Sequence, residues 1–211
     1  YKILVFNYDA KNIDFRNMSR FDEAEAYILQ TKATGQASQG ITPLYGFVVD
    51  SLEITPGQDK SGTLVLTPLV RHVTFTVQVD KPGEIKTCKG SLSGVSTSLN
   101  LSKRKVVTEA STNVEFDMET SDKGVNGDLI ILGTALPKEE EQKPVTNQVT
   151  IDFTLSDGSM VSATVDLEDK LNEIDTPHVN VTINATVEKS PKFTIRLTNW
   201  EVGPGEETTI E

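Results

Sequence analysis

One run of residues settles the fold class: Val73-Thr74-Phe75-Thr76-Val77-Gln78-Val79-Asp80 has an apolar side chain at every second position. Strict alternation is typical of a β-strand with one face in the core and the other in water. The alternation returns in five later runs, at 114–119, 149–156, 161–167, 179–188 and 193–198. Because such strands have one wetted face, they favour antiparallel sheets over the buried parallel sheets of α/β proteins.

Turn signals separate these runs. Asp157-Gly158 lies between two of them and predicts a tight hairpin turn. Lys81-Pro82-Gly83 predicts another turn, because proline presets the turn conformation and cannot continue a sheet ladder. Many short strands joined by turns predict an all-β chain with antiparallel β-sandwich architecture.

The remaining elements are shorter. Further strands are predicted at 1–6, 45–49 and 63–67. Ser19 can cap a helix over residues 20–28, whose apolar residues then share one face and whose first turn is acidic. Asp166 can cap a second, shorter helix over 167–171. Both helices are expected to be short connections between strands.

The regular alternation begins after Pro68, which predicts a domain boundary near residue 70. Residues 1–69 are expected to form an N-terminal β-sandwich domain and residues 70–211 a C-terminal one. The first of these is short of strands, and the chain opens directly on a strand without an initiator methionine. We therefore expect a processed or trimmed chain whose first sandwich has strands upstream of Tyr1.

Composition excludes several classes of protein. The 211 residues carry a net charge of −11, which repels phosphate backbones, so nucleic acid is not expected as a partner. One cysteine cannot form an intrachain disulfide or a thiolate zinc cage. No run approaches the ~18 apolar residues that a membrane-spanning helix needs.

The search for reactive side chains assigns no catalytic, cofactor-binding or metal-binding residue. His72 and His178 lie far apart without the spacing of a zinc motif, so they are expected to be surface histidines. Cys88 is expected to be a buried thiol in a strand. The Gly90-to-Gly94 segment has leucine where a nucleophile elbow needs serine, and Ser102 lacks companion motifs for its Ser-x-x-Lys spacing.

Two features leave alternatives open. The segment from Asp117 to Asp128 is rich in oxygen ligands, but it does not match the EF-hand register, so a polar turn is the expectation and calcium the alternative. Trp200 is the only tryptophan and ends an alternating strand, which favours a packing role over a carbohydrate platform.

The order of motifs along the chain resembles the fimbrillin-like surface proteins of Bacteroides and their relatives, which include anchors and minor subunits of fimbriae. The matching segments cover most of the chain: 4–9, 15–18, 21–27, 66–73, 90–95, 155–158, 165–171 and the late Trp200. None of these segments is a catalytic signature. Their shared order carries the resemblance.

The resemblance implies an exported surface lipoprotein with two transthyretin-like β-sandwich domains and no cofactor. Its lipid anchor to the outer membrane would lie outside this chain, and its location would be the cell surface, the outer membrane or the fimbrium. Polymerising members of the family join by β-strand addition, in which a strand of one subunit fills a groove of the next. The opening strand and the tail from Gly203 to Glu211 are compatible with that mechanism.

Three functional hypotheses follow from the sequence. The first is a non-enzymatic fimbrial protein, either a subunit, an anchor or a tip adhesin, with other fimbrial subunits and host or bacterial surface ligands as partners. The second is a glycan-binding module of a polysaccharide-uptake system, which predicts an exposed aromatic shelf. The third is a hydrolase, which needs serine, histidine or aspartate side chains to converge from different strands.

Overall fold

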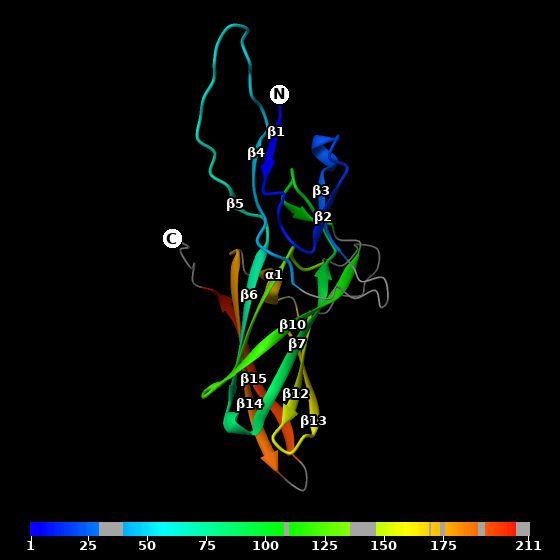
Figure 1. The fold of residues 1–211 in the computed structure, drawn as a ribbon, viewed down its shortest axis with the longest axis vertical. Helices are drawn as coiled ribbons and strands as arrows, with labels where there is room; N and C mark the ends of the chain where they lie inside the picture. Colours follow the sequence, from blue (N-terminus) through cyan, green and yellow to red (C-terminus); the bar gives the residue numbers. More distant parts are fainter. Residues whose placement is uncertain are drawn as a thin grey trace.

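The computed structural model describes residues 1–29, 40–107, 110–135, 147–168, 170–173, 176–189 and 193–205. These residues form three β-sheets in an elongated molecule (Figure 1). A three-stranded sheet has the order β1-β4-β5: β1 (Ile3–Phe6), β4 (Tyr45–Val49) and β5 (Thr67–Pro68). A four-stranded sheet has the order β2-β3-β8-β9: β2 (Ile13–Arg16), β3 (Glu25–Ile28), β8 (Ser98–Asn100) and β9 (Lys105–Val106).

The third sheet is the body of the molecule and has eight strands in the order β13-β12-β7-β10-β11-β6-β14-β15. Its strands are β6 (Arg71–Val79), β7 (Ile85–Ser96), β10 (Ser111–Ser121), β11 (Gly124–Ile131), β12 (Gln148–Leu155), β13 (Met160–Asp166), β14 (His178–Lys189) and β15 (Phe193–Pro204). All neighbours are antiparallel except β6 and β14, which are parallel. The sheet curves around its core, so that the edge strands β13 and β15 contact each other. The prediction of an all-β fold with antiparallel sheets is confirmed.

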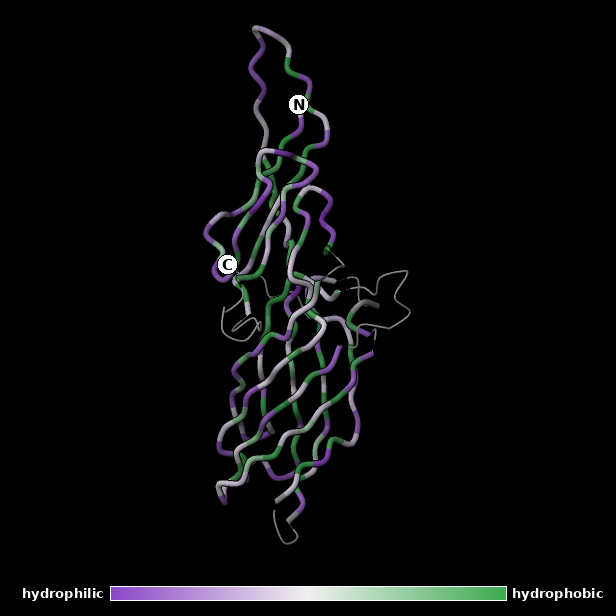
Figure 2. Tube along the Cα trace, turned by 90° about the vertical axis from the view of Figure 1, so that its right-hand side faces the viewer, coloured by the Kyte–Doolittle hydropathy of each residue, from purple (hydrophilic) through white to green (hydrophobic). Residues whose placement is uncertain are grey.

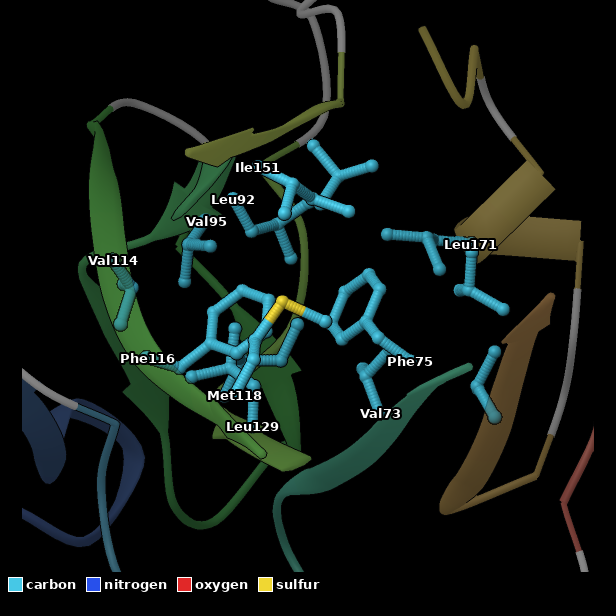
Figure 3. Close-up of a cluster of buried hydrophobic side chains, with 14 of the residues drawn as sticks. Val73, Phe75, Leu92, Val95, Val114, Phe116, Met118, Leu129, Ile151 and Leu171 are labelled. Atoms are coloured by element: carbon cyan, nitrogen blue, oxygen red, sulfur yellow. The ribbon is translucent and has the colours of Figure 1, made fainter. Parts of the chain in front are cut away.

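Alternation along the strands builds the core of the eight-stranded sheet. On β6, Val73, Phe75, Val77 and Val79 are buried, whereas the residues between them are not. Figure 2 shows this alternation as hydrophobic and hydrophilic stretches that follow one another along the strands. Side chains from several strands meet in the middle, where Phe75 stacks on Phe116 with ring centroids 4.7 Å apart (Figure 3).

The chain passes directly from the eight-stranded sheet into the small sheets. β8 follows β7 directly along the chain. It pairs with β3 on one side and with β9 on the other, as part of the four-stranded sheet. Ile41 is also buried, and its N–H donates to the carbonyl of Ile130 on β11. The division of the chain at residue 70 into two domains stays a prediction.

The predicted turn at Asp157-Gly158 is confirmed. Gly158 has a φ of 83°, which glycine adopts without steric cost, and the Ser159 N–H donates to Asp157 Oδ1 at 2.9 Å. The hairpin β12–β13 closes directly around this turn.

Both predicted helices are shorter than expected. The first is one 3₁₀ turn, η1 (Phe21–Glu23), and β3 follows it. The helical interpretation of residues 24–28 was wrong because Ala24, Ala26 and Ile28 are buried at every second position, which is the period of a strand. The second is the single turn α1 (Lys170–Glu173), which begins three residues later than predicted, and Asp166, the expected cap, is instead the last residue of β13. Another 3₁₀ turn, η2 (Pro82–Glu84), lies at the predicted Lys81-Pro82-Gly83 turn. No helix in the described part of the chain is long and apolar enough to cross a membrane.

Candidate functional site

The three-stranded sheet has an open edge beside β5. β5 pairs with β4 at two positions only, Tyr45 with Pro68 and Gly46 with Thr67. If this register continued, Phe47 would lie opposite Leu66 and Val49 opposite Leu64. Instead, residues 63–66 are extended without a ladder partner in the described structure, and β4 beyond Gly46 pairs only with β1. The side of β4 that faces β5, beyond Gly46, and residues 63–66 therefore have no strand partner, and we call these two unpaired stretches the slot.

The slot is bounded by a long protrusion, residues 50–66, which we call the arm. The arm extends from the small sheets at one end of the molecule, and its two limbs stand apart (Figure 1). A turn inside it is fixed by Pro56 and Gly57, since the Gln58 N–H donates to the Thr55 carbonyl and Gly57 has a φ of 78°. The Lys60 ammonium donates to the carbonyl of Glu53, which links the two limbs.

The descending limb of the arm is apolar and exposed. Leu64, Val65 and Leu66 are 46%, 68% and 38% exposed, and Ile54 on the ascending limb is 53% exposed. Leucine and valine in an extended, water-exposed run are costly to leave uncovered, since burying such a side chain is worth about 1.5–3 kcal/mol. The sequence predicts a strand over residues 63–67. In the structure, only Thr67 of these residues pairs with another strand, at Gly46 of β4.

At the end of the slot next to Gly46, the side chain of Arg104 hydrogen-bonds to β4. Its guanidinium donates to the carbonyl of Gly46 at 3.0 Å, and Thr67 Oγ1 donates to the same carbonyl at 3.4 Å. An open pocket of about 780 Å³ lies at this junction and is lined by Arg104, Thr67 and Leu132, among others. The free strand edges therefore begin directly beyond Gly46. Nothing in the sequence could have located this point, because it depends on where two limbs diverge.

A second surface feature is an aromatic group between the small sheets. Tyr8 stacks on Phe15 with ring centroids 5.0 Å apart, and Phe6 lies 4.8 Å from Phe15. Tyr8 is 71% exposed, while Phe6 and Phe15 are half-buried. The Asn7 amide beside them is held in place, since it accepts from the Tyr45 N–H at 2.6 Å and donates to Asp9 Oδ1 at 3.1 Å. The arrangement is a rigid aromatic shelf with polar groups beside it.

Trp200 lies elsewhere. It is on β15, half-buried, and packs against the core of the large sheet, as the sequence predicted.

Cys88 is a buried thiol on β7, as expected. Burial raises the pKa of this thiol to about 11, because a thiolate is poorly solvated in an apolar surrounding. The Cys88 thiol donates only a weak contact to the Met118 carbonyl at 3.8 Å. A thiol with so high a pKa is a poor nucleophile at neutral pH.

The two histidines come together, although they are far apart in the sequence. His178 on β14 lies at the register position of His72 on β6, and the ring centroids are 5.5 Å apart. His72 Nε2 also lies 3.1 Å from Asp128 Oδ1. A single sequence offers no signal for this contact, because it rests on the parallel pairing of β6 and β14.

The other motifs lie in ordinary strand and turn positions. The segment 90–94 is the middle of β7, with Leu92 fully buried. Ser102 is in the turn between β8 and β9, and its hydroxyl donates to Asn100 Oδ1 at 3.1 Å. The segment from Asp117 to Asp128, where a polar turn was expected, has its turn at residues 122–123 only, and the residues on either side form the hairpin β10–β11. Among the described residues, no three or more His, Cys, Asp or Glu side chains are grouped to hold a metal ion.

Comparisons with known proteins agree with this fold. The family model described as "Domain of unknown function (DUF5119)" matches residues 1–117. The fold is similar to that of the fimbrial anchor protein Mfa2 from Porphyromonas gingivalis, with a TM-score of 0.58 and 12% identity over 97% of this chain and 75% of that one. It is also similar to a candidate adhesin from Bacteroides ovatus, with a TM-score of 0.57 and 19% identity over 94% and 75% of the two chains. The search of curated proteins found no match. The neighbours confirm the resemblance to fimbrillin-like proteins at the level of the fold.

Proposed function

We propose a fimbrial role for this chain, which belongs to the family described as "Domain of unknown function (DUF5119)". It acts as a non-enzymatic surface protein, as a subunit, an anchor or a tip adhesin, and it joins other fimbrial components by β-strand addition. The protein is exported and held at the outer membrane or in the fimbrium, with two transthyretin-like sandwich domains that meet near residue 70. The fold it shares with a fimbrial anchor and a candidate adhesin supports this role.

The observation that carries the proposal is the slot. An inserted strand would find unpaired backbone on both sides, from β4 beyond Gly46 and from residues 63–66. Main-chain hydrogen bonds then give affinity, and pockets for alternate side chains give specificity. Insertion would also cover Leu64 and Leu66, which water now reaches.

Peptide binding tests strand addition. A synthetic peptide of residues 203–211 is added in excess to the intact chain and to a chain without residues 1–7, and the midpoint of thermal unfolding is measured. A strand that binds only the folded state raises the midpoint, and above the Kd the rise grows with the logarithm of the free peptide concentration. A scrambled peptide of the same composition is the control. If neither form responds, or if the scrambled peptide acts equally, strand addition through this tail is wrong and an anchor or adhesin role is favoured.

Proline variants test whether the slot is the acceptor. Successive N–H groups of a strand point to opposite sides, so either Leu64→Pro or Val65→Pro removes a donor that faces the slot. One of the two is expected to abolish the midpoint shift. Ser61→Pro, in the arm but outside the apolar run, is expected to leave it intact. A shift that survives both Leu64→Pro and Val65→Pro would place the acceptor elsewhere.

The aromatic shelf favours glycan binding as a second candidate function, in a surface module of a polysaccharide-uptake system. An exposed tyrosine that is stacked on a second ring offers a flat apolar face beside polar groups, and it loses little conformational entropy on binding. A glycan array tests this directly. Tyr8→Ala is expected to abolish any signal, and Tyr1→Ala, which also removes an exposed ring, is expected to retain it.

A further inference from the structure

The contact between His72 and His178 joins two separate parts of the chain. β6 and β14 are the only parallel pair among the described strands, and this pair attaches the β14–β15 hairpin to the rest of the sheet. The two imidazoles are the only ones in the chain. They meet with ring centroids 5.5 Å apart and ring planes inclined by 65°.

A carboxylate orients one of the rings. Asp128 Oδ1 lies 3.1 Å from His72 Nε2 and also accepts from the Thr74 hydroxyl at 2.8 Å. Histidines that bind metals commonly donate their other ring N–H to a carboxylate, which fixes the tautomer and raises the basicity of the ligating nitrogen. When Nε2–H donates to Asp128, the lone pair of His72 lies on Nδ1.

The spacing of the rings suits a shared ion. Two imidazoles on one tetrahedral metal, with metal–nitrogen bonds of about 2.0–2.1 Å, have ring centroids about 5 Å apart. The separation of 5.5 Å is close to that value.

We propose that His72 and His178 chelate a divalent transition-metal ion, with Asp128 as the positioning residue for His72. Imidazole ligands suit Cu²⁺, Ni²⁺ and Zn²⁺, whereas Mg²⁺ and Ca²⁺ prefer oxygen ligands. The protein supplies two ring nitrogens, and water fills the remaining positions. Affinity therefore follows the general order for these ions, with Cu²⁺ bound more tightly than Ni²⁺. The bound ion links β14 to β6 and stabilises the fold.

Calorimetric titration of the chain without a histidine tag tests the site. NiCl₂ is expected to bind at one equivalent and to raise the midpoint of thermal unfolding, and EDTA is expected to reverse the rise. MgCl₂ serves as the control and should have no effect. His72→Gln and His178→Gln are each expected to abolish the binding. Asp128→Asn is expected to weaken it about 10-fold, as the loss of an outer-shell partner does.

A second measurement needs no variant. Diethylpyrocarbonate modifies free imidazole nitrogens, so Ni²⁺ is expected to slow the modification of both histidines together, as read by mass spectrometry. The proposal is overturned if Ni²⁺ gives no heat, if MgCl₂ acts equally, or if binding persists in either histidine variant. It is also overturned if only one histidine is protected. The midpoint of each variant in EDTA shows whether the fold is intact.

Discussion

Phe116 packs where it does because its neighbour across the ladder has no side chain. Gly90 on β7 pairs with Phe116 on β10, and a Cβ built on Gly90 would lie 2.2 Å from the ring. Gly127 on β11 lies close to the same ring, at 3.0 Å from a built Cβ. The ring fills space that two glycines leave free. Glycine inside a strand usually weakens it, but Gly90 is required here because a larger residue would collide with Phe116.

Replacing this glycine should cost stability. Gly90→Ala is expected to destabilise the fold by about 1–3 kcal/mol, because the added methyl group displaces Phe116 from a packed core. Urea unfolding measures the change. Gly83→Ala is the matched control, since a Cβ there meets nothing within 4 Å, and it should be close to neutral. Equal effects of the two substitutions would contradict the packing argument.

The Cys88 thiol should report on unfolding. Its pKa is about 11 in the fold and 9.0 in an unperturbed thiol, so the fold favours the protonated form. This contribution to stability is complete below pH 9 and is lost as the pH rises through about 11. At pH 8 a disulfide reagent is expected to label Cys88 only at the rate of unfolding, and urea should accelerate labelling sharply. Rapid labelling of the native chain would show that the thiol is accessible.

At the scale of elements, alternation could be read from the sequence wherever a strand has one buried face. β6, β10, β12, β13 and β14 were located in this way, and so was the turn at Asp157-Gly158. β3 was mistaken for a helix because the four-residue spacing of Ala24 and Ile28 fits both the helical and the strand period over so few residues. The open edge of β4 and the meeting of the two histidines could not be predicted, since both depend on pairings between distant segments.

The arm should be the first described element to be cut by a protease. Lys60 is exposed within it and lies outside any ladder, so brief native digestion with trypsin is expected to cut after this residue. Lys89, inside β7 between two neighbouring strands, is expected to resist until the chain unfolds. Mass spectrometry identifies the products. If the slot accepts the 203–211 peptide, the peptide should slow the cut, whereas the scrambled peptide should not.

At the scale of the whole molecule, the position of the arm and the net charge affect how two copies approach each other. The long strands of the eight-stranded sheet form the body of the molecule, and the arm and both small sheets lie at one end of it (Figure 1). The net charge of −11 is a source of electrostatic repulsion between copies at neutral pH. In the proposed strand addition, local pairing at this end of the molecule acts against the repulsion between copies.

Repulsion between copies should disappear near the isoelectric point. The sequence gives a pI of about 4.7, so light scattering is expected to show net repulsion at pH 7 in low salt and attraction as the pH falls toward that value. Raising the salt to about 0.1 M shortens the screening length to about 10 Å and should weaken the repulsion at pH 7. Repulsion that does not change with salt would show that charge is not its origin.

A strand edge that is free to pair also carries a hazard of uncontrolled aggregation. Segments of about six or seven β-prone residues without proline are those that stack into amyloid. In the arm, the apolar run is limited to Leu64-Val65-Leu66, with Gly62 before it and Pro68 soon after. Pro56 in the turn of the arm and Lys60 on the same limb as the apolar run precede this run, as gatekeeper residues do. The apolar run is therefore shorter than the segments that typically stack into fibrils.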